Sequence, residues 1–248
     1  VTVTQAGGDA INVTGGSAPV IEDVALTASR DGIVVADGNG PIVQKSAFSR
    51  NSIRVGDRGI YFSGSIGSYR IYDTDIWAGT DSTNDHGIHS GNTWADYRIE
   101  RNVIYQAGGR GMYIEGDSSN GVIASNLIRG AAVEGLRVGR NPAWATATVS
   151  GNCFYNTTNI YNNYRSASFF SGSSGNFWGS SPTGSGYSDT CADANSNGIC
   201  DAAYSVPGAG GANMPRSDDY PLKTCSLVPK IVPNAEYRFD ECSAYSNG

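Results

Sequence analysis

Six side chains stand at matching places in successive copies of a short motif, Gly-Ile-x-x, and could together form a binding surface. The third residue of each copy, and in one copy the fifth, supplies them: Tyr61, His89, Tyr113, Glu115, Arg137 and Tyr161. In a β-strand alternate residues point to the same face, so an inward Ile leaves these residues outside. Aromatic rings beside Arg and Glu suit sugar rings, hydroxyls and carboxylates. The pattern therefore predicts a carbohydrate-binding face.

The same face could carry catalysis on an acidic sugar. Abstracting a proton beside a carboxylate needs a base, an acid and a group that neutralises the carboxylate. His89 is the candidate base, Tyr113 the acid and Arg137 the neutralising group. The alternative is an ordinary cross-strand ladder of side chains that stabilises a sheet. Glycosidase chemistry is disfavoured, because this register places Glu115 and Glu100 on different sheets, where they would not face each other.

A second candidate site is the polar loop between residues 193 and 201. Short oxygen donors stand at every second position around a Gly that permits a sharp bend, and one residue can offer its carbonyl: Asp193, Asn195, Asn197, Ile199 and Asp201. This spacing is typical of calcium loops, so a structural Ca²⁺ ion is the expected cofactor.

The calcium loop departs from the EF-hand pattern in one respect. Its twelfth position is Tyr204 rather than a bidentate Glu, so Asp189, Asp218 or Asp219 would have to complete the ligand shell. The alternative is a loop closed by Asx turns without an ion. Both interpretations are open from the sequence.

The five cysteines cluster towards the C-terminus. Cys191 and Cys200 bracket the calcium loop and are expected to form a disulfide, and Cys225 and Cys242 flank the tail. Such clustering favours an oxidising compartment, with free thiols in a cytosolic protein as the alternative. Cys153 is expected to be the odd one, buried and unpaired.

A repeat of about 24 residues must position these side chains. Copies of Gly-Ile-x-x, such as those at residues 59–62 and 111–114, alternate with copies of a second motif, aliphatic-x-x-Asn-x-aliphatic, as at residues 99–104 and 123–128. Two motifs with one period indicate one structural unit per repeat, and an Asn at each bend can hydrogen-bond the units above and below. Leu, Glu and Lys number only 5, 6 and 3, which disfavours helices.

Two or three short strands per repeat fit a solenoid in which equivalent strands stack in parallel. The registered motifs resemble the right-handed parallel β-helix family. This resemblance implies an all-β, right-handed parallel β-helix (solenoid) of about seven coils over residues 1–179, followed by a loop-rich C-terminal cap over 180–226. A β-sandwich with evenly spaced strands is the alternative.

Motifs after the repeat carry two further resemblances. Gly175-Asn-Phe-Trp-Gly179, Asn197-Gly-Ile-Cys-Asp201 and Asp218-Asp-Tyr-Pro-Leu222 resemble the end of NosD-like and archaeal surface β-helix proteins. Copper does not carry over, since the chain has two Met and no Met/His/Cys cluster. Residues 235–243 resemble the first strand of LamG-like domains, so 227–248 is interpreted as a linker and the start of a following domain.

The composition limits the classes of partner that the protein is expected to bind. The formal net charge is −6 with 16% charged residues, and no basic stripe exists, so nucleic acid is not expected as a partner. No apolar run is long enough to span a membrane. The chain reads as a piece of a larger precursor, without a visible signal peptide.

The sequence therefore predicts an extracellular or cell-surface module beside neighbouring domains of the same precursor. It would act as a rigid stalk or as a domain that binds a polysaccharide or cell-surface glycan. The alternative function is that of a polysaccharide lyase or epimerase that acts on an acidic polysaccharide.

Overall fold

The computed structural model describes most of the repeat region and the cap. The described residues are 1–5, 7–14, 20–36, 42–43, 51–64, 68–91, 96–115, 120–156, 158–180, 184–207 and 216–227, without the side chains of 42–43, 140–145, 163–166 and 216. The expected linker and following domain beyond Leu227, together with Cys242, lie outside these residues.

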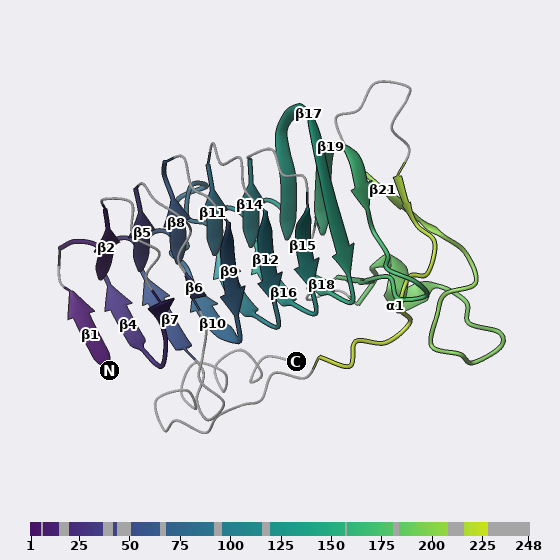
Figure 1. The fold of residues 1–248 in the computed structure, drawn as a ribbon. Helices are drawn as coiled ribbons and strands as arrows, with labels where there is room; N and C mark the ends of the chain where they lie inside the picture. The colour runs from purple at the N-terminus through teal and green to yellow at the C-terminus, as the bar shows by residue number, and fades with distance from the viewer. Residues whose placement is uncertain are drawn as a thin grey trace, which may run out of the picture.

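The described chain winds into a solenoid whose coils stack side by side, with the N-terminus at one end and the cap at the other (Figure 1). One strand of each coil joins an eight-stranded parallel sheet. In sheet order its members are β1 (Thr2–Gln5), β4 (Ala25–Ala28), β7 (Asn51–Val55), β10 (Thr74–Trp77), β13 (Val103–Ala107), β16 (Leu127–Ala131), β18 (Cys153–Tyr155) and β20 (Phe177–Gly179).

The other strands form a twelve-stranded sheet, which rises through the coils and then returns. It ascends through β2 (Ile11–Val13), β5 (Ile33–Val35), β8 (Ile60–Phe62), β11 (Ile88–Ser90) and β14 (Met112–Ile114). It turns at the long strand β17 (Leu136–Ser150), with which β19 (Ile160–Ser168) pairs. It returns through β15 (Gly121–Ala124), β12 (Tyr97–Glu100), β9 (Tyr69–Tyr72), β6 (Ile42–Val43) and β3 (Val20–Ile21). The predicted all-β parallel solenoid is confirmed.

The aliphatic residue of each Gly-Ile-x-x copy points into the core. Equivalent strands pair in the register that the motif predicts, and five members of this inward ladder are 0% exposed: Ile33, Ile60, Ile88, Met112 and Leu136. Because side chains alternate along a strand, an inward second residue places the third residue of every copy on the outer face.

The Asn of the second motif forms a buried ladder along the solenoid. The side-chain Oδ1 of Asn126 accepts the backbone N–H of Asn102 at 2.9 Å, and Asn152 accepts that of Asn126 at 2.9 Å. The Nδ2 group of Asn126 also donates to the carbonyl of Ile99 at 2.8 Å. Each Asn thus joins adjacent coils, and its buried amide groups are satisfied.

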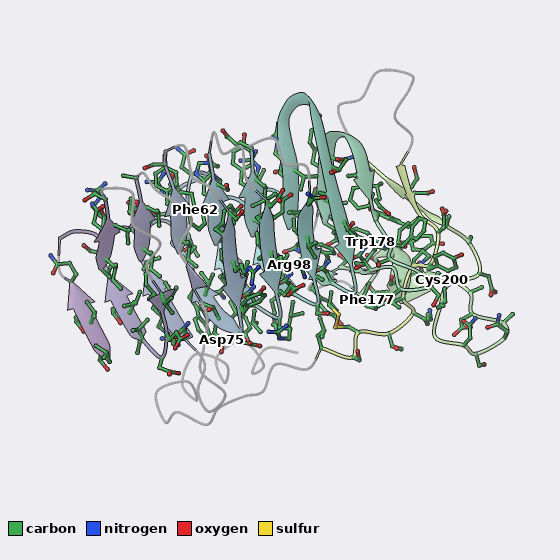
Figure 2. The ribbon with its side chains drawn as sticks, in the orientation of Figure 1. Phe62, Asp75, Arg98, Phe177, Trp178 and Cys200 are labelled. Carbon is green, nitrogen blue, oxygen red and sulfur yellow. A yellow bond between two sulfur atoms is a disulfide. The ribbon has the colours of Figure 1, made fainter. Side chains whose placement is uncertain are left out.

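The cap ends this ladder with a carboxylate. It comprises the short helix α1 (Tyr187–Thr190) and the antiparallel pair β21 (Tyr204–Val206) and β22 (Arg216–Asp218). Asp218 is 0% exposed and accepts N–H groups from the backbone of Asn176 at 2.6 Å, the indole of Trp178 at 2.9 Å and the backbone of Tyr220 at 3.1 Å. Trp178 lies where the last coil meets the cap (Figure 2).

Two disulfides hold the C-terminal part. Cys191 and Cys200 pair as predicted. The expectation that Cys153 is unpaired is wrong, because it pairs with Cys225. Cys153 starts β18 with its side chain on the outer face of the eight-stranded sheet, beside Val103, Leu127 and Phe177, where the returning segment Leu222–Leu227 packs.

Candidate functional site

The predicted outer residues form one straight column on the twelve-stranded sheet. Backbone pairing aligns successive coils in the order Tyr61, His89, Tyr113, Arg137 and Tyr161, here called the outward column. Their strands are neighbours, so these residues lie about 4.8 Å apart along the solenoid axis. The structure thus brings together the residues that the sequence singled out.

The members of the outward column stack on one another. The ring of His89 lies between those of Tyr61 (centroids 4.9 Å apart) and Tyr113 (5.1 Å apart, 8° between planes). The Arg137 guanidinium continues the stack, 5.6 Å from the Tyr113 ring centre and 4.9 Å from that of Tyr161. Because the ring faces contact each other, a ligand along this column would meet ring edges and hydroxyl groups rather than the expected open ring faces.

A second column of charged residues runs beside the first. Its members each precede the Gly of a motif copy: Asp31, Arg58, His86, Arg110 and Glu134. Arg58 binds Asp31 through two side-chain hydrogen bonds of 2.9 and 2.7 Å, and Arg110 binds Glu134. This charged column neutralises itself to a large extent.

The charged column was not predicted from the sequence. The signal was present, because all five occupy the same motif position. The motif position does not reveal the pairing, which joins Asp31 to Arg58 and Arg110 to Glu134 and leaves His86 between the two pairs.

His86 is the buried centre of the charged column. It is 2% exposed, and its Nδ1 accepts the backbone N–H of Arg110 at 3.0 Å. Its ring stands edge-on to those of His89 and Tyr113, with centroids 5.0 and 5.4 Å apart. Burial, followed by the nearby positive charges, lowers the pKa of His86 to about 3, so the imidazole is neutral at ordinary pH.

His89 is poorly placed to act as a base in this conformation. Both ring nitrogens are buried and have no hydrogen-bond partner among the described residues. The Nε2 atom lies 3.8 Å from the Oε1 atom of Glu115. A substrate proton would reach neither nitrogen unless a side chain moved. Burial and a hydrogen bond with Glu115 raise the pKa of Tyr113, so this phenol stays protonated.

A comparable stack occurs on the eight-stranded sheet and was not anticipated from the sequence. Its column contains Arg54, Trp77, Tyr105, Arg129 and Tyr155. The Trp77 and Tyr105 rings are 4.7 Å apart and 16° from parallel. Stacked columns therefore stabilise both sheets. The twelve-stranded sheet differs from the eight-stranded sheet by the charged column that runs beside its stack.

The predicted calcium loop is ordered by its own side chains. The Asp193 carboxylate accepts the backbone N–H groups of Asn197 at 3.0 Å and Gly198 at 2.9 Å. Asp201 accepts the N–H of Ala194 at 3.0 Å. Every such oxygen keeps a second lone pair, so the donor set still fits a hard cation. Within the described ranges, no group of three His, Cys, Asp or Glu side chains converges as a metal site.

Two carboxylates expected to complete the calcium shell are used elsewhere. Asp218 ends the Asn ladder, and Asp189 accepts the backbone N–H groups of Ser180 and Gly186 at 2.8 Å each. Asp219 accepts the hydroxyl of Ser217. Ligands beyond the loop would therefore have to be water molecules or backbone carbonyls.

The family described as right handed beta helix region matches residues 1–182. The chain belongs to this family. No curated protein and no solved structure matches it. In the described part of the chain, no helix is long and apolar enough to cross a membrane. Membership of the right-handed β-helix family accounts for the fold, but any chemistry depends on the particular side chains that the fold positions.

The neutral state of His86 predicts a specific pH dependence of stability. Below pH 6.5 an unfolded His binds a proton, whereas folded His86 stays neutral down to about pH 3. Stability should therefore fall as pH decreases from 6 to 4, by about 1.4 kcal/mol per pH unit from this residue. His86→Gln should show a shallower decline of stability with falling pH, measured by urea unfolding. Parallel curves for wild type and His86→Gln would contradict a buried neutral imidazole.

Proposed function

We propose that this β-helix is an extracellular or cell-surface module that binds an acidic polysaccharide along the outward column. The observation that carries the proposal is the unbroken register of Tyr61, His89, Tyr113, Arg137 and Tyr161 on consecutive coils. A repeating polymer can use repeating contacts, and this straight row presents one polar side chain at each coil, with a Tyr hydroxyl at every second coil.

Arg137 is the group best suited to a sugar carboxylate. Its closest approach to Glu134 is 3.8 Å, and its Nε has no hydrogen-bond partner among the described residues. Arg58 and Arg110, by contrast, are engaged by Asp31 and Glu134. The buried Nε cannot reach a ligand, but the Arg137 side chain is 24% exposed, and a guanidinium that a ligand can reach binds a carboxylate through charge-assisted hydrogen bonds.

The disulfides support an extracellular location. Cys153–Cys225 joins residues 72 apart in sequence, and Cys191–Cys200 closes the cap loop. Structural disulfides persist in oxidising environments and are rare in the cytosol. Coils joined to the cap by a disulfide would also suit a rigid stalk. If no glycan binds, the proposed function is that of a stalk alone.

The second candidate function is that of a polysaccharide lyase or epimerase with His89 as base, Tyr113 as acid and Arg137 as neutralising group. The closeness of His89 and Tyr113, with rings 5.1 Å apart, favours it. The burial of both His89 nitrogens disfavours it, because a base must reach the proton that it abstracts.

Binding is tested by retention of the protein on immobilised alginate, pectate and glycosaminoglycans. Tyr113→Ala and Arg137→Ala should each weaken retention about tenfold, which corresponds to about 1.4 kcal/mol. Tyr105→Ala removes a stacked ring from the eight-stranded sheet and is the matched control, so it should bind like wild type.

The outcomes separate the candidates. Equal losses for Tyr105→Ala and Tyr113→Ala would contradict the assignment of the outward column. If the protein is retained on none of these polymers, the stalk is the remaining function. Release of an unsaturated product, detected by absorbance and abolished by His89→Ala, would replace binding with lyase activity.

We also propose that the cap loop holds a structural Ca²⁺ ion through Asp193, Asn195, Asn197, Asp201 and the carbonyl of Ile199. All four side chains of this set already turn oxygens towards the loop backbone. Asn195 accepts the N–H of Asn197 at 3.1 Å, and Asn197 accepts that of Ile199 at 2.9 Å, beside the bonds to Asp193 and Asp201. The Cys191–Cys200 disulfide closes the loop and reduces the ordering needed for binding.

Removal of calcium should lower the melting temperature. An ion that binds only the folded state stabilises it by mass action, so chelator should destabilise the wild type and Asp193→Ala should abolish the chelator effect. Asp219→Ala, outside the loop, is the control and should respond like wild type. If chelator leaves the melting temperature unchanged, the calcium proposal is contradicted, and the loop is held by its disulfide and Asx turns.

A further inference from the structure

The cap loop contains an asparagine followed by a glycine, Asn197-Gly198, whose groups are arranged for a reaction with each other. In such a pair the backbone nitrogen of the glycine can attack the side-chain amide carbon of the asparagine, because glycine has no side chain to block the approach. The side-chain oxygen of Asn197 accepts the backbone N–H of Ile199 at 2.9 Å and so forms an Asx turn. This turn folds the side chain back over the following peptide bond, beside the nitrogen of Gly198.

The hydrogen bond of the Asx turn would also stabilise the charge that develops during the attack. As the nitrogen of Gly198 bonds to the amide carbon, negative charge builds up on the side-chain oxygen of Asn197. The N–H of Ile199 already points at that oxygen, as the donors of an oxyanion hole do. The stabilising donor is therefore in place before the reaction starts.

A carboxylate lies where the attacking nitrogen must lose its proton. The backbone N–H of Gly198 donates to Oδ2 of Asp193 at 2.9 Å. An amide nitrogen is a weak nucleophile until its proton is removed, so an acceptor at hydrogen-bond distance can serve as general base. The carbonyl of Gly198 is held as well, because it accepts the backbone N–H of Lys223 at 2.9 Å. Asn197 is exposed, so water can reach the product.

A second Asn-Gly pair within the described residues lacks this arrangement. The side-chain nitrogen of Asn120 lies 3.4 Å from Oδ2 of Asp96, so this amide is directed towards the adjacent coil. Gly121 begins β15, is buried and packs against the ring of Tyr97. The two pairs share a sequence and differ in their surroundings, so their comparison isolates the effect of the structure.

We propose that Asn197 is a site of deamidation that the cap loop itself promotes. The nitrogen of Gly198 forms a bond to the side-chain amide carbon of Asn197 while Asp193 accepts its proton. The bond from that carbon to the amide nitrogen then breaks, and ammonia leaves with the proton that Asp193 returns. The product is a cyclic succinimide, which water opens to aspartate or isoaspartate. Either product adds a negative charge to the loop.

The aspartate product would give the loop a third carboxylate beside those of Asp193 and Asp201. Calcium affinity depends on the number of charged ligands, so this product would bind the ion more tightly. That consequence rests on the proposed calcium site, whereas the deamidation needs no ion.

Incubation of the intact, folded chain at neutral pH tests the proposal, with the modified residues located by digestion and tandem mass spectrometry. Chelator is present throughout, so the result does not depend on calcium binding. Asn197 should deamidate at least about tenfold faster than Asn120, a margin within what a positioned general base contributes. In the reduced chain unfolded in urea the two rates should be similar, because both sites have the same dipeptide sequence.

Two variants of the loop test the assigned base. Asp193→Asn keeps the shape of the side chain but removes the base, and should slow deamidation of Asn197 by about tenfold. Asp201→Asn is the matched control and should react at the wild-type rate, because Asp201 accepts the N–H of Ala194 rather than that of Gly198.

The comparison within the wild type requires no variant to fold. The proposal would be overturned if the ratio of the Asn197 and Asn120 rates were the same in the folded and the unfolded chain. It would equally be overturned if Asp193→Asn reacted as fast as the wild type, or if Asp201→Asn slowed the reaction as much as Asp193→Asn does.

Discussion

The structure depends on a chain of buried amides that ends on a carboxylate. Asn102, Asn126, Asn152 and Asn176 each fix one coil to the next, and every amide is oriented the same way. Such a series needs a final group that only accepts hydrogen bonds, and Asp218 of the cap supplies it. Burial raises the pKa of Asp218 against the opposing effect of its N–H donors. The cap and the coils are therefore one cooperative unit.

The outward column follows from the same constraint. A slip of one residue between coils would turn every outer side chain into the core, so a ladder that fixes the bend of each coil also fixes the position of Tyr113 relative to His89 and Arg137. The resulting stack is closely packed, and both ring nitrogens of His89 are buried within it. A preorganised row of this kind favours binding of a repeating polymer over chemistry that requires a freely accessible base.

Motif spacing predicts the interactions that recur from coil to coil, but it does not predict interactions that occur only once in the chain. The inward Ile ladder, the outward column and the bridging Asn residues all follow from one period, because each interaction joins equivalent positions on adjacent coils. The Cys153–Cys225 disulfide could not be predicted, since it depends on where the C-terminal segment returns across the eight-stranded sheet. Nor could the role of Asp218, which the loop pattern suggested as a calcium ligand and which the ladder instead uses.

The most direct test of this account is the unfolding free energy of Asp218→Ala, measured in urea beside Asp219→Ala. Removing Asp218 leaves the N–H donors of Asn176 and Trp178 without their buried acceptor, so a loss of about 3 kcal/mol or more is expected. Exposed Asp219 should change stability by less than about 0.5 kcal/mol. Equal, small effects of the two substitutions would contradict the claim that the solenoid depends on its terminal carboxylate.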